Sequence, residues 1–132
     1  MLEVFHVDYD RIPAEKMLWV IMGRPKDTHV RLCAELWSAG VYDKVATLYA
    51  PTLELGELEH AFRQTNSAEY EWYGPQRQTA VVTPHFKSGE GALRSTSVGD
   101  VMRLGDKWYV VGSSGFEELT PHIAPPAESI QA

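Results

Sequence analysis

Two β-rich runs joined by a two-residue turn constrain this chain more than any other feature. Asp100-Val-Met-Arg-Leu comes first, Gly105-Asp106 follows, and Lys107-Trp-Tyr-Val-Val completes the pattern. A Gly-X pair between such runs is typical of a type II′ turn, in which glycine takes the first central position. The chain then bends at Gly112-Ser-Ser-Gly. We therefore predict a β-hairpin module over residues 94–119.

Three further segments have the composition of β-strands. Leu2–Val7 is predicted to begin the sheet, with Leu2 and His6 on the same face because side chains alternate along a strand. Residues 42–49 are rich in Val, Thr and Tyr and end before a proline, which is typical of a strand. Residues 79–83 are a short strand candidate.

Two segments have the periodicity of amphipathic helices. One is predicted from Asp27 or Thr28 to about residue 39, and the other from Thr52 to about residue 65. Residues 17–22 are apolar throughout, so their periodicity fits either a buried strand or a short buried helix, and we favour the strand. The expected fold class is α+β: a mostly antiparallel sheet, two helices packed on one face and a C-terminal β-hairpin.

The length of the chain indicates a single domain. With 132 residues, 44% of them hydrophobic, it can bury one core. We expect the α+β domain to span residues 1–120 and a flexible, proline-containing tail to span residues 121–132. The longest apolar stretch, residues 17–22, is far shorter than the roughly 20 residues that cross a bilayer, so no membrane partner is expected. A lone cysteine, Cys33, and the lack of a signal-type N-terminus predict a cytoplasmic location in the host cell.

Charge and motifs exclude several function classes. The net charge of −6 disfavours direct binding to nucleic acid, whose phosphates attract cations. The five histidines are scattered singly, and the spacings typical of zinc sites, phosphate loops or nucleophile elbows are absent from the sequence. Cys33 falls on the apolar face of its predicted helix, where a thiol is unreactive. We predict no catalytic residue, no metal and no cofactor, and we lean against an enzyme.

Negative charge is concentrated in residues 54–71, which hold five acids and one base. Aromatic residues are interleaved with the acids, and a negative patch with exposed aromatics can bind a basic groove, including one built for nucleic acid. The alternative is that the acids form the solvated face of a helix while the aromatics pack into the core. The candidate partner-binding residues are Glu54, Glu57, Glu59, Glu69, Tyr70, Glu71, Trp72 and Tyr73.

A second candidate site lies in the run Arg94-Ser-Thr-Ser-Val-Gly-Asp-Val, which is followed by Trp108-Tyr-Val-Val and Gly115-Phe-Glu-Glu-Leu. This pattern resembles small phage- and plasmid-encoded proteins similar to YodL-like domains, over roughly residues 53–119. The resemblance implies an origin on a mobile element and supplies no catalytic residues. The residues of the run either fix a strand entry and a turn or form an exposed polar corner. The candidate residues of this corner are Arg94, Ser95, Ser97 and Asp100, beside Trp108 and Phe116.

The leading functional expectation is a small acidic, phage-type protein that binds and inhibits or modulates a host or defence protein with a basic surface. Its sharpest form is an anti-restriction or anti-CRISPR mimic of nucleic acid. One alternative is an enzyme, because Phe5-His6, Ser95-Thr96-Ser97 and Glu117-Glu118 resemble, in order, the pieces of an ADP-ribosyltransferase. That family has a glycine and a hydroxyl residue where Val7-Asp8 stand here. A structure in which these pieces converge in one pocket would favour the enzyme.

A third possibility is a nucleic-acid-binding accessory protein. Between residues 77 and 107 five bases outnumber three acids (Glu90, Asp100 and Asp106), and binding to nucleic acid would then depend on salt. The five basic residues are Arg77, Lys87, Arg94, Arg103 and Lys107.

Overall fold

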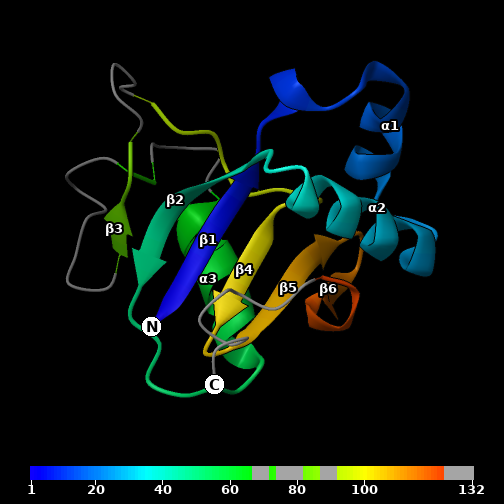
Figure 1. Ribbon diagram of the computed structural model, residues 1–132. Helices are drawn as coiled ribbons and strands as arrows, with labels where there is room; N and C mark the ends of the chain where they lie inside the picture. Colours follow the sequence, from blue (N-terminus) through cyan, green and yellow to red (C-terminus); the bar gives the residue numbers. More distant parts are fainter. Residues whose placement is uncertain (67–71, 74–81, 87–91, 124–132) are drawn as a thin grey trace, which may run out of the picture.

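The computed structural model describes residues 1–66, 72–73, 82–86 and 92–123, and these form one antiparallel sheet covered by helices (Figure 1). The strand order is β3-β2-β1-β4-β5-β6. The strands are β1 (Leu2–Val7), β2 (Tyr42–Leu48), β3 (Val82–Pro84), β4 (Val101–Leu104), β5 (Lys107–Gly112) and β6 (Gly115–Glu118). The helices are α1 (Ala14–Met22), α2 (Lys26–Ser38) and α3 (Gly56–Thr65), with short 3-10 helices at Tyr9–Arg11 and Thr120–His122.

Strand β1 lies in the middle of the sheet, between β2 and β4. Its side chains alternate as predicted: Leu2 and Val4 enter the core under α3, whereas Phe5 packs against the core under α2. The register with β2 shifts between Val4 and Phe5. His6 therefore lies on an interior strand of the sheet.

Helix α3 covers one face of the sheet. Leu58 and Ala61 of the helix are fully buried against residues of β1, β2, β4 and β5. The helix was predicted to begin at Thr52, but it begins at Gly56, because the Thr52 hydroxyl accepts a hydrogen bond from Glu54 N (3.2 Å) in the turn before the helix. After β5, the chain turns back and β6 pairs with β5, which brings Phe116 beside Phe62 of α3, with ring centroids 6.4 Å apart.

Helix α2 covers the other face. Its inward residues Val30, Cys33 and Ala34 pack on Val101 and Val110 of the sheet. An aromatic group extends this core: the Trp37 and Trp108 ring centroids lie 4.6 Å apart, and Phe5 lies 5.2 Å from Trp37. Leu119 is also buried here, and Ile123 packs against the same core.

The predicted α+β class, the antiparallel sheet and the C-terminal hairpins are confirmed. Gly105 has the positive φ of 64° that the first position of the predicted turn needs, and Leu104 pairs with Lys107. The helices differ from the expectation of a single face: α2 lies in front of the sheet and α3 behind it in Figure 1. Strands β4 and β5 bury consecutive residues, whose side chains alternate between the two faces, so both faces are apolar and each needs its own covering helix.

Residues 17–22, for which we favoured a strand, belong to helix α1. The run is preceded by Ala14, Glu15 and Lys16, which have high helix propensity, and Gly23 ends it in the left-handed conformation (φ 71°). A Cβ at Gly23 would lie 2.7 Å from Val98 Cγ1, so close packing also requires glycine there.

In the part of the chain that the structure describes, no helix is long and apolar enough to cross a membrane. Of the predicted tail, residues 124–132 lie outside the described residues. The candidate strand over residues 79–83 is described only from Val82, where β3 begins.

Candidate functional site

The predicted polar corner is built around a buried ion pair between Arg94 and Asp100. Arg94 Nη1 donates to Asp100 Oδ2 and Arg94 Nη2 donates to Asp100 Oδ1, both at 2.7 Å. The Asp100 side chain is fully buried and also accepts backbone hydrogen bonds from Val7 N (2.9 Å) and Ser97 N (2.7 Å). This bidentate geometry with two further donors satisfies the carboxylate completely.

The rest of the corner ties the loop before β4 to the end of β1. Arg94 Nη2 donates to Val7 O (2.8 Å), Nη1 donates to Ser95 O (3.0 Å), and the guanidinium lies 4.2 Å from the centre of the Tyr9 ring. The Ser97 hydroxyl donates to Ser95 O at 3.3 Å. The polar groups of the corner are therefore directed at one another.

Trp108 and Phe116 do not join the corner. Trp108 lies in the core under α2, and Phe116 packs on the core under α3, on the opposite face. The structure thus brings together four of the six residues in this candidate site and separates the two aromatic ones.

Sequence reasoning missed a chain of hydroxyl groups beside the corner. The Thr65 hydroxyl donates to Ala61 O, and the Thr96 hydroxyl donates to Thr65 Oγ1, each at 2.8 Å. Because both hydroxyl protons are used, Thr96 Oγ1 must accept from His6 Nε2, which lies 2.8 Å away. Thr96 adjoins the predicted Ser95 and Ser97, and the resemblance to an ADP-ribosyltransferase grouped it with His6, although as part of a catalytic site and not of a hydrogen-bond chain.

His6 is a structural donor in this arrangement. Burial lowers its pKa to about 4, Asp100 at 3.9 Å partly opposes that effect, and Arg94 lowers the pKa further. The neutral imidazole donates its Nε2 proton in a hydrogen bond to Thr96. Because its pKa is so low, it is a weak base near neutral pH.

The aromatic part of the predicted partner-binding patch is corrected by the structure. Trp72 is only 1% exposed, and its indole Nε1 donates to Arg94 O at 2.9 Å, so it belongs to the core and the corner. Tyr73 is partly buried, with its ring edge-on to those of Trp72 and Phe86 at 5.7 Å each. Burial of a large indole ring is favourable because it removes apolar area from water, and the indole N–H keeps a hydrogen-bond acceptor in the core. Glu69, Tyr70 and Glu71 lie outside the described residues.

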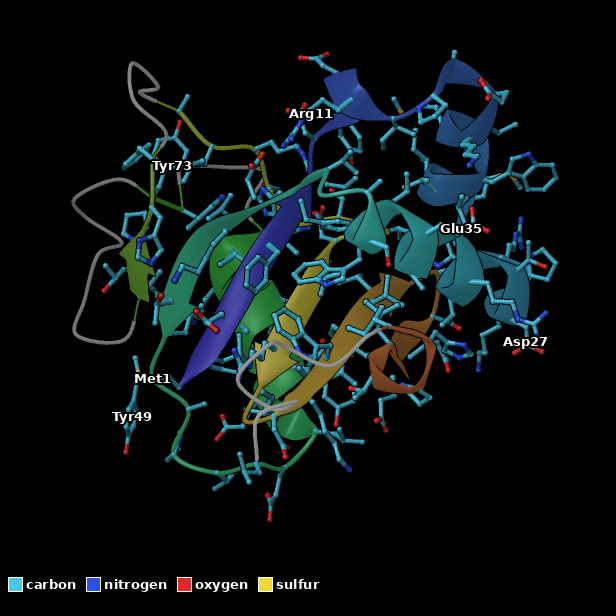
Figure 2. The ribbon with its side chains drawn as sticks, in the orientation of Figure 1. Met1, Arg11, Asp27, Glu35, Tyr49 and Tyr73 are labelled. Atoms are coloured by element: carbon cyan, nitrogen blue, oxygen red, sulfur yellow. The ribbon has the colours of Figure 1, made fainter. Side chains whose placement is uncertain are left out.

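The acidic part of the patch is on the surface and has different apolar neighbours from those predicted. Glu54 and Glu59 are exposed, and Glu57 Oε2 accepts from Thr52 N and Thr52 Oγ1 at 2.9 Å each. Leu53 is 72% exposed, and Leu55 and Tyr49 also project from this part of the chain. In Figure 2, Tyr49 and Met1 lie at the end of the sheet away from α1. We name this region the acidic surface: Tyr49, Leu53, Glu54, Leu55, Glu57 and Glu59.

Of the three fragments that resemble an ADP-ribosyltransferase, two meet and the third lies apart. His6 contacts Thr96 on the α3 side of the sheet, with the His6 and Trp72 ring centroids 6.4 Å apart. Glu117 lies on the other side, where its carboxylate is 3.1 Å from Lys26 Nζ of α2. Opposite faces of a sheet cannot form one pocket, which counts against the enzyme.

The basic segment does not form a free cationic patch in the part that the structure describes. Arg94 is paired with Asp100, and Arg103 lies 3.8 Å from Glu3 and 5.1 Å from the Trp108 ring centre. Lys107 is exposed, and Arg77 and Lys87 lie outside the described residues.

A cavity of about 430 Å³ opens beside the corner at the end of β1. Its cations already have partners: Arg94 binds Asp100, and Lys44 binds Glu3 at 3.0 Å. His85 Nε2 lies 2.7 Å from Thr47 Oγ1. The cavity is lined by His6, Val7, Asp8, Tyr9, Asp10, Asp43, Lys44, Val45, His85, Ala92, Leu93 and Arg94.

Within the described ranges the structure shows no cluster of metal ligands, and it keeps the thiol of Cys33 protonated. No cluster of three or more His, Cys, Asp or Glu residues there could hold a metal ion. Cys33 is buried, and burial raises the pKa of its thiol to about 12, so the thiol stays protonated.

The most exposed apolar helix is α1, whose residues 17–22 the sequence indicated as an apolar run to be buried and not as a binding surface. Leu18 is 61% exposed and Ile21 is 51% exposed, and Trp19 and Met22 are also at the surface. We name these four residues the apolar ridge. A run of large apolar side chains at the surface of a small protein marks an interaction site.

Comparison of the chain with protein-family models, with curated proteins and with solved structures found no match in any of the three. The structure itself shows an α+β fold with helices on both faces of an antiparallel sheet. Its distinguishing surfaces are the acidic surface at one end of β1 and the apolar ridge beyond the other end.

Proposed function

We propose that the protein acts by stoichiometric binding to another protein, through the acidic surface, and that the partner presents a basic, partly apolar face. The observation that carries this proposal is the exposure of Leu53 and Leu55 on either side of Glu54. Apolar side chains supply binding free energy when buried, and the carboxylates select a cationic partner.

The partner class that the sequence resemblance implies is part of the proposal: a host or defence protein that the chain inhibits or modulates. A surface that pairs carboxylates with apolar groups can occupy a groove built for nucleic acid, because the groove's cations bind carboxylates as well as phosphates. Support for binding over catalysis comes from the polar corner, where the side chains bind one another, and from the separation of His6 and Glu117.

The test compares proteins captured from a host-cell extract by the immobilised wild type and by two surface variants. The variants are Leu53→Ser/Leu55→Ser and Glu54→Lys/Glu59→Lys, and Glu118→Lys, at an exposed position on β6, is the control for charge reversal away from the acidic surface. We expect a partner retained by the wild type and by the control, and bound about tenfold more weakly by both surface variants, as a loss of about 1.4 kcal/mol would give. Equal capture by all four proteins would overturn the proposal.

The mimicry form of the proposal has its own test. If the acidic surface occupies a nucleic-acid groove, duplex DNA added to the captured complex should release the partner as its concentration rises. If Glu54→Lys/Glu59→Lys weakens the complex but DNA does not dissociate it, the binding function stands and mimicry of nucleic acid is excluded.

A further inference from the structure

Helix α1 is apolar on nearly every side, but the fold covers only one of its sides. Val20 is fully buried and Met17 packs on the neighbouring core, whereas Leu18 and Ile21 face outward. A helix that is hydrophobic all round is normally buried on all sides. Helices α2 and α3 expose polar residues on their outer sides, so α1 is the exception among the described helices.

A groove runs between α1 and α2 beside the ridge, with a volume of about 390 Å³. Trp19 from α1 and Leu32 from α2 supply its apolar lining. Lys16 and Glu35 line it as well, with their charged groups 3.5 Å apart. The remaining lining residues are Thr28 and Arg31.

One arginine of this groove is available to a partner. Arg31 lines the groove and is exposed. Among the described residues no carboxylate lies within ion-pair distance of Arg31, in contrast to Arg94 and Arg103. In a chain of net charge −6, the groove therefore combines an apolar lining with a guanidinium group that no described carboxylate pairs.

We propose that the groove between α1 and α2, together with the apolar ridge, binds an amphipathic helix of a partner protein that carries carboxylates beside its apolar face. Two adjacent helices form a groove that a third helix fills, with apolar side chains at positions i, i+3, i+4 and i+7. Helix α1 has nine residues, or roughly 13 Å at 1.5 Å per residue, which accommodates two to three turns. A carboxylate on the partner forms a bidentate pair with Arg31.

Charge disfavours the other occupants of this surface. A second copy that paired through the same groove would bring its own Arg31 against this one, and like charges across an interface repel. An anionic lipid surface would be repelled by the net charge of −6, and a flat bilayer does not fill a groove between helices. This inference goes beyond the proposed function, because it concerns a different surface with a partner of opposite charge.

The first experiment uses two designed peptides of about 16 residues, long enough to form a helix. Both carry leucines at the spacing given above, and one has glutamates and the other lysines beside them. Fluorescence anisotropy of the labelled peptides should show saturable binding of the acidic peptide and at least about tenfold weaker binding of the basic one. Arg31→Glu should reverse this preference, whereas Lys107→Glu, at an exposed position on β5, should leave it unchanged.

The second experiment tests the ridge. Leu18→Gln/Ile21→Gln should weaken binding of the acidic peptide about tenfold, and Leu55→Ser on the acidic surface should not. Circular dichroism checks that each variant folds. Equal affinity for both peptides, or no saturable binding of the acidic one, would overturn the proposal.

The same variants also test the two other occupants, a second copy of the chain and a lipid surface. Self-association in sedimentation that Leu18→Gln/Ile21→Gln abolishes, without binding of the acidic peptide, would assign the groove to a second copy. Binding to vesicles of phosphatidylcholine and phosphatidylserine, again without peptide binding, would assign it to lipid. Either outcome overturns the proposal.

Discussion

The polar corner and the apolar ridge contrast in what their sequences indicate and in what their side chains do. The corner lies in the most recognisable segment of the chain, yet Arg94, Ser97 and Asp100 bond to one another and to β1. The ridge has no motif, and its four large apolar side chains lie at the surface. The recognisable segment of this protein therefore stabilises the fold. The proposed binding surface lies on helix α1, which has no sequence motif.

The physical reason lies in the cost of burial. A buried carboxylate needs a partner for every lone pair, which demands particular residues at particular positions and leaves a visible pattern. Among the described residues every buried side-chain nitrogen and oxygen has a hydrogen-bond partner. A binding surface made of Leu, Ile, Met and Trp needs only apolar area, so its sequence carries no such pattern.

Asp100→Asn should give the largest effect and tests whether the corner is structural. The change removes the charge opposite Arg94, whose side chain is only 30% exposed, and breaking a buried pair typically costs about 3–5 kcal/mol. Urea unfolding measures this loss. Asp106→Asn, in the exposed hairpin turn, is the matched control and should change stability by less than about 0.5 kcal/mol. Equal effects of the two variants would remove the distinction between corner and surface.

His6 supplies a second effect, which depends on pH. Because burial lowers its pKa from 6.5 to about 4, the unfolded chain binds a proton in this window and the folded chain does not. The free energy of unfolding should therefore fall as the pH is lowered from about 6.5 to 4, by about 3 kcal/mol from this residue.

His6→Gln removes the titrating group and should flatten this slope, while His60→Gln, on the exposed side of α3, should not. Some slope should remain in His6→Gln, because burial also lowers the pKa of His29. Unfolding by urea across the pH range measures all three proteins. Parallel slopes for the wild type and His6→Gln would show that His6 is not the neutral donor of the hydroxyl chain.

Sequence reasoning predicted the elements whose pattern is local. The alternation in Leu2–Val7 and the Gly105-Asp106 turn each identify a strand or hairpin without knowledge of the rest of the chain. The run at residues 17–22 has no period that separates a strand from a helix, whereas the preceding Ala14, Glu15 and Lys16 have high helix propensity and begin helix α1.

The candidate sites were harder to predict, because they depend on contacts between distant residues. His6 and Thr96 are 90 positions apart, and Trp72 reaches Arg94 across 22. Trp72 stands among acids in the sequence, so its neighbours suggested exposure, whereas the structure buries it in the core under α3. The exposure of the acids in the same patch follows from local pattern, because they lie near the start of a helix on its polar side. Glu54 and Glu59 are at the surface.

The smallest expected effect on stability belongs to the apolar ridge, and it sharpens the contrast with the corner. Leu18→Gln/Ile21→Gln should change the free energy of unfolding by less than about 0.5 kcal/mol, since both side chains are exposed and Gln has high helix propensity. Val20→Ala, at the buried position between them, should cost about 2 kcal/mol. A large loss in the double variant would mean that the ridge is needed for folding; a small loss with altered peptide binding would mean that it is kept for a partner.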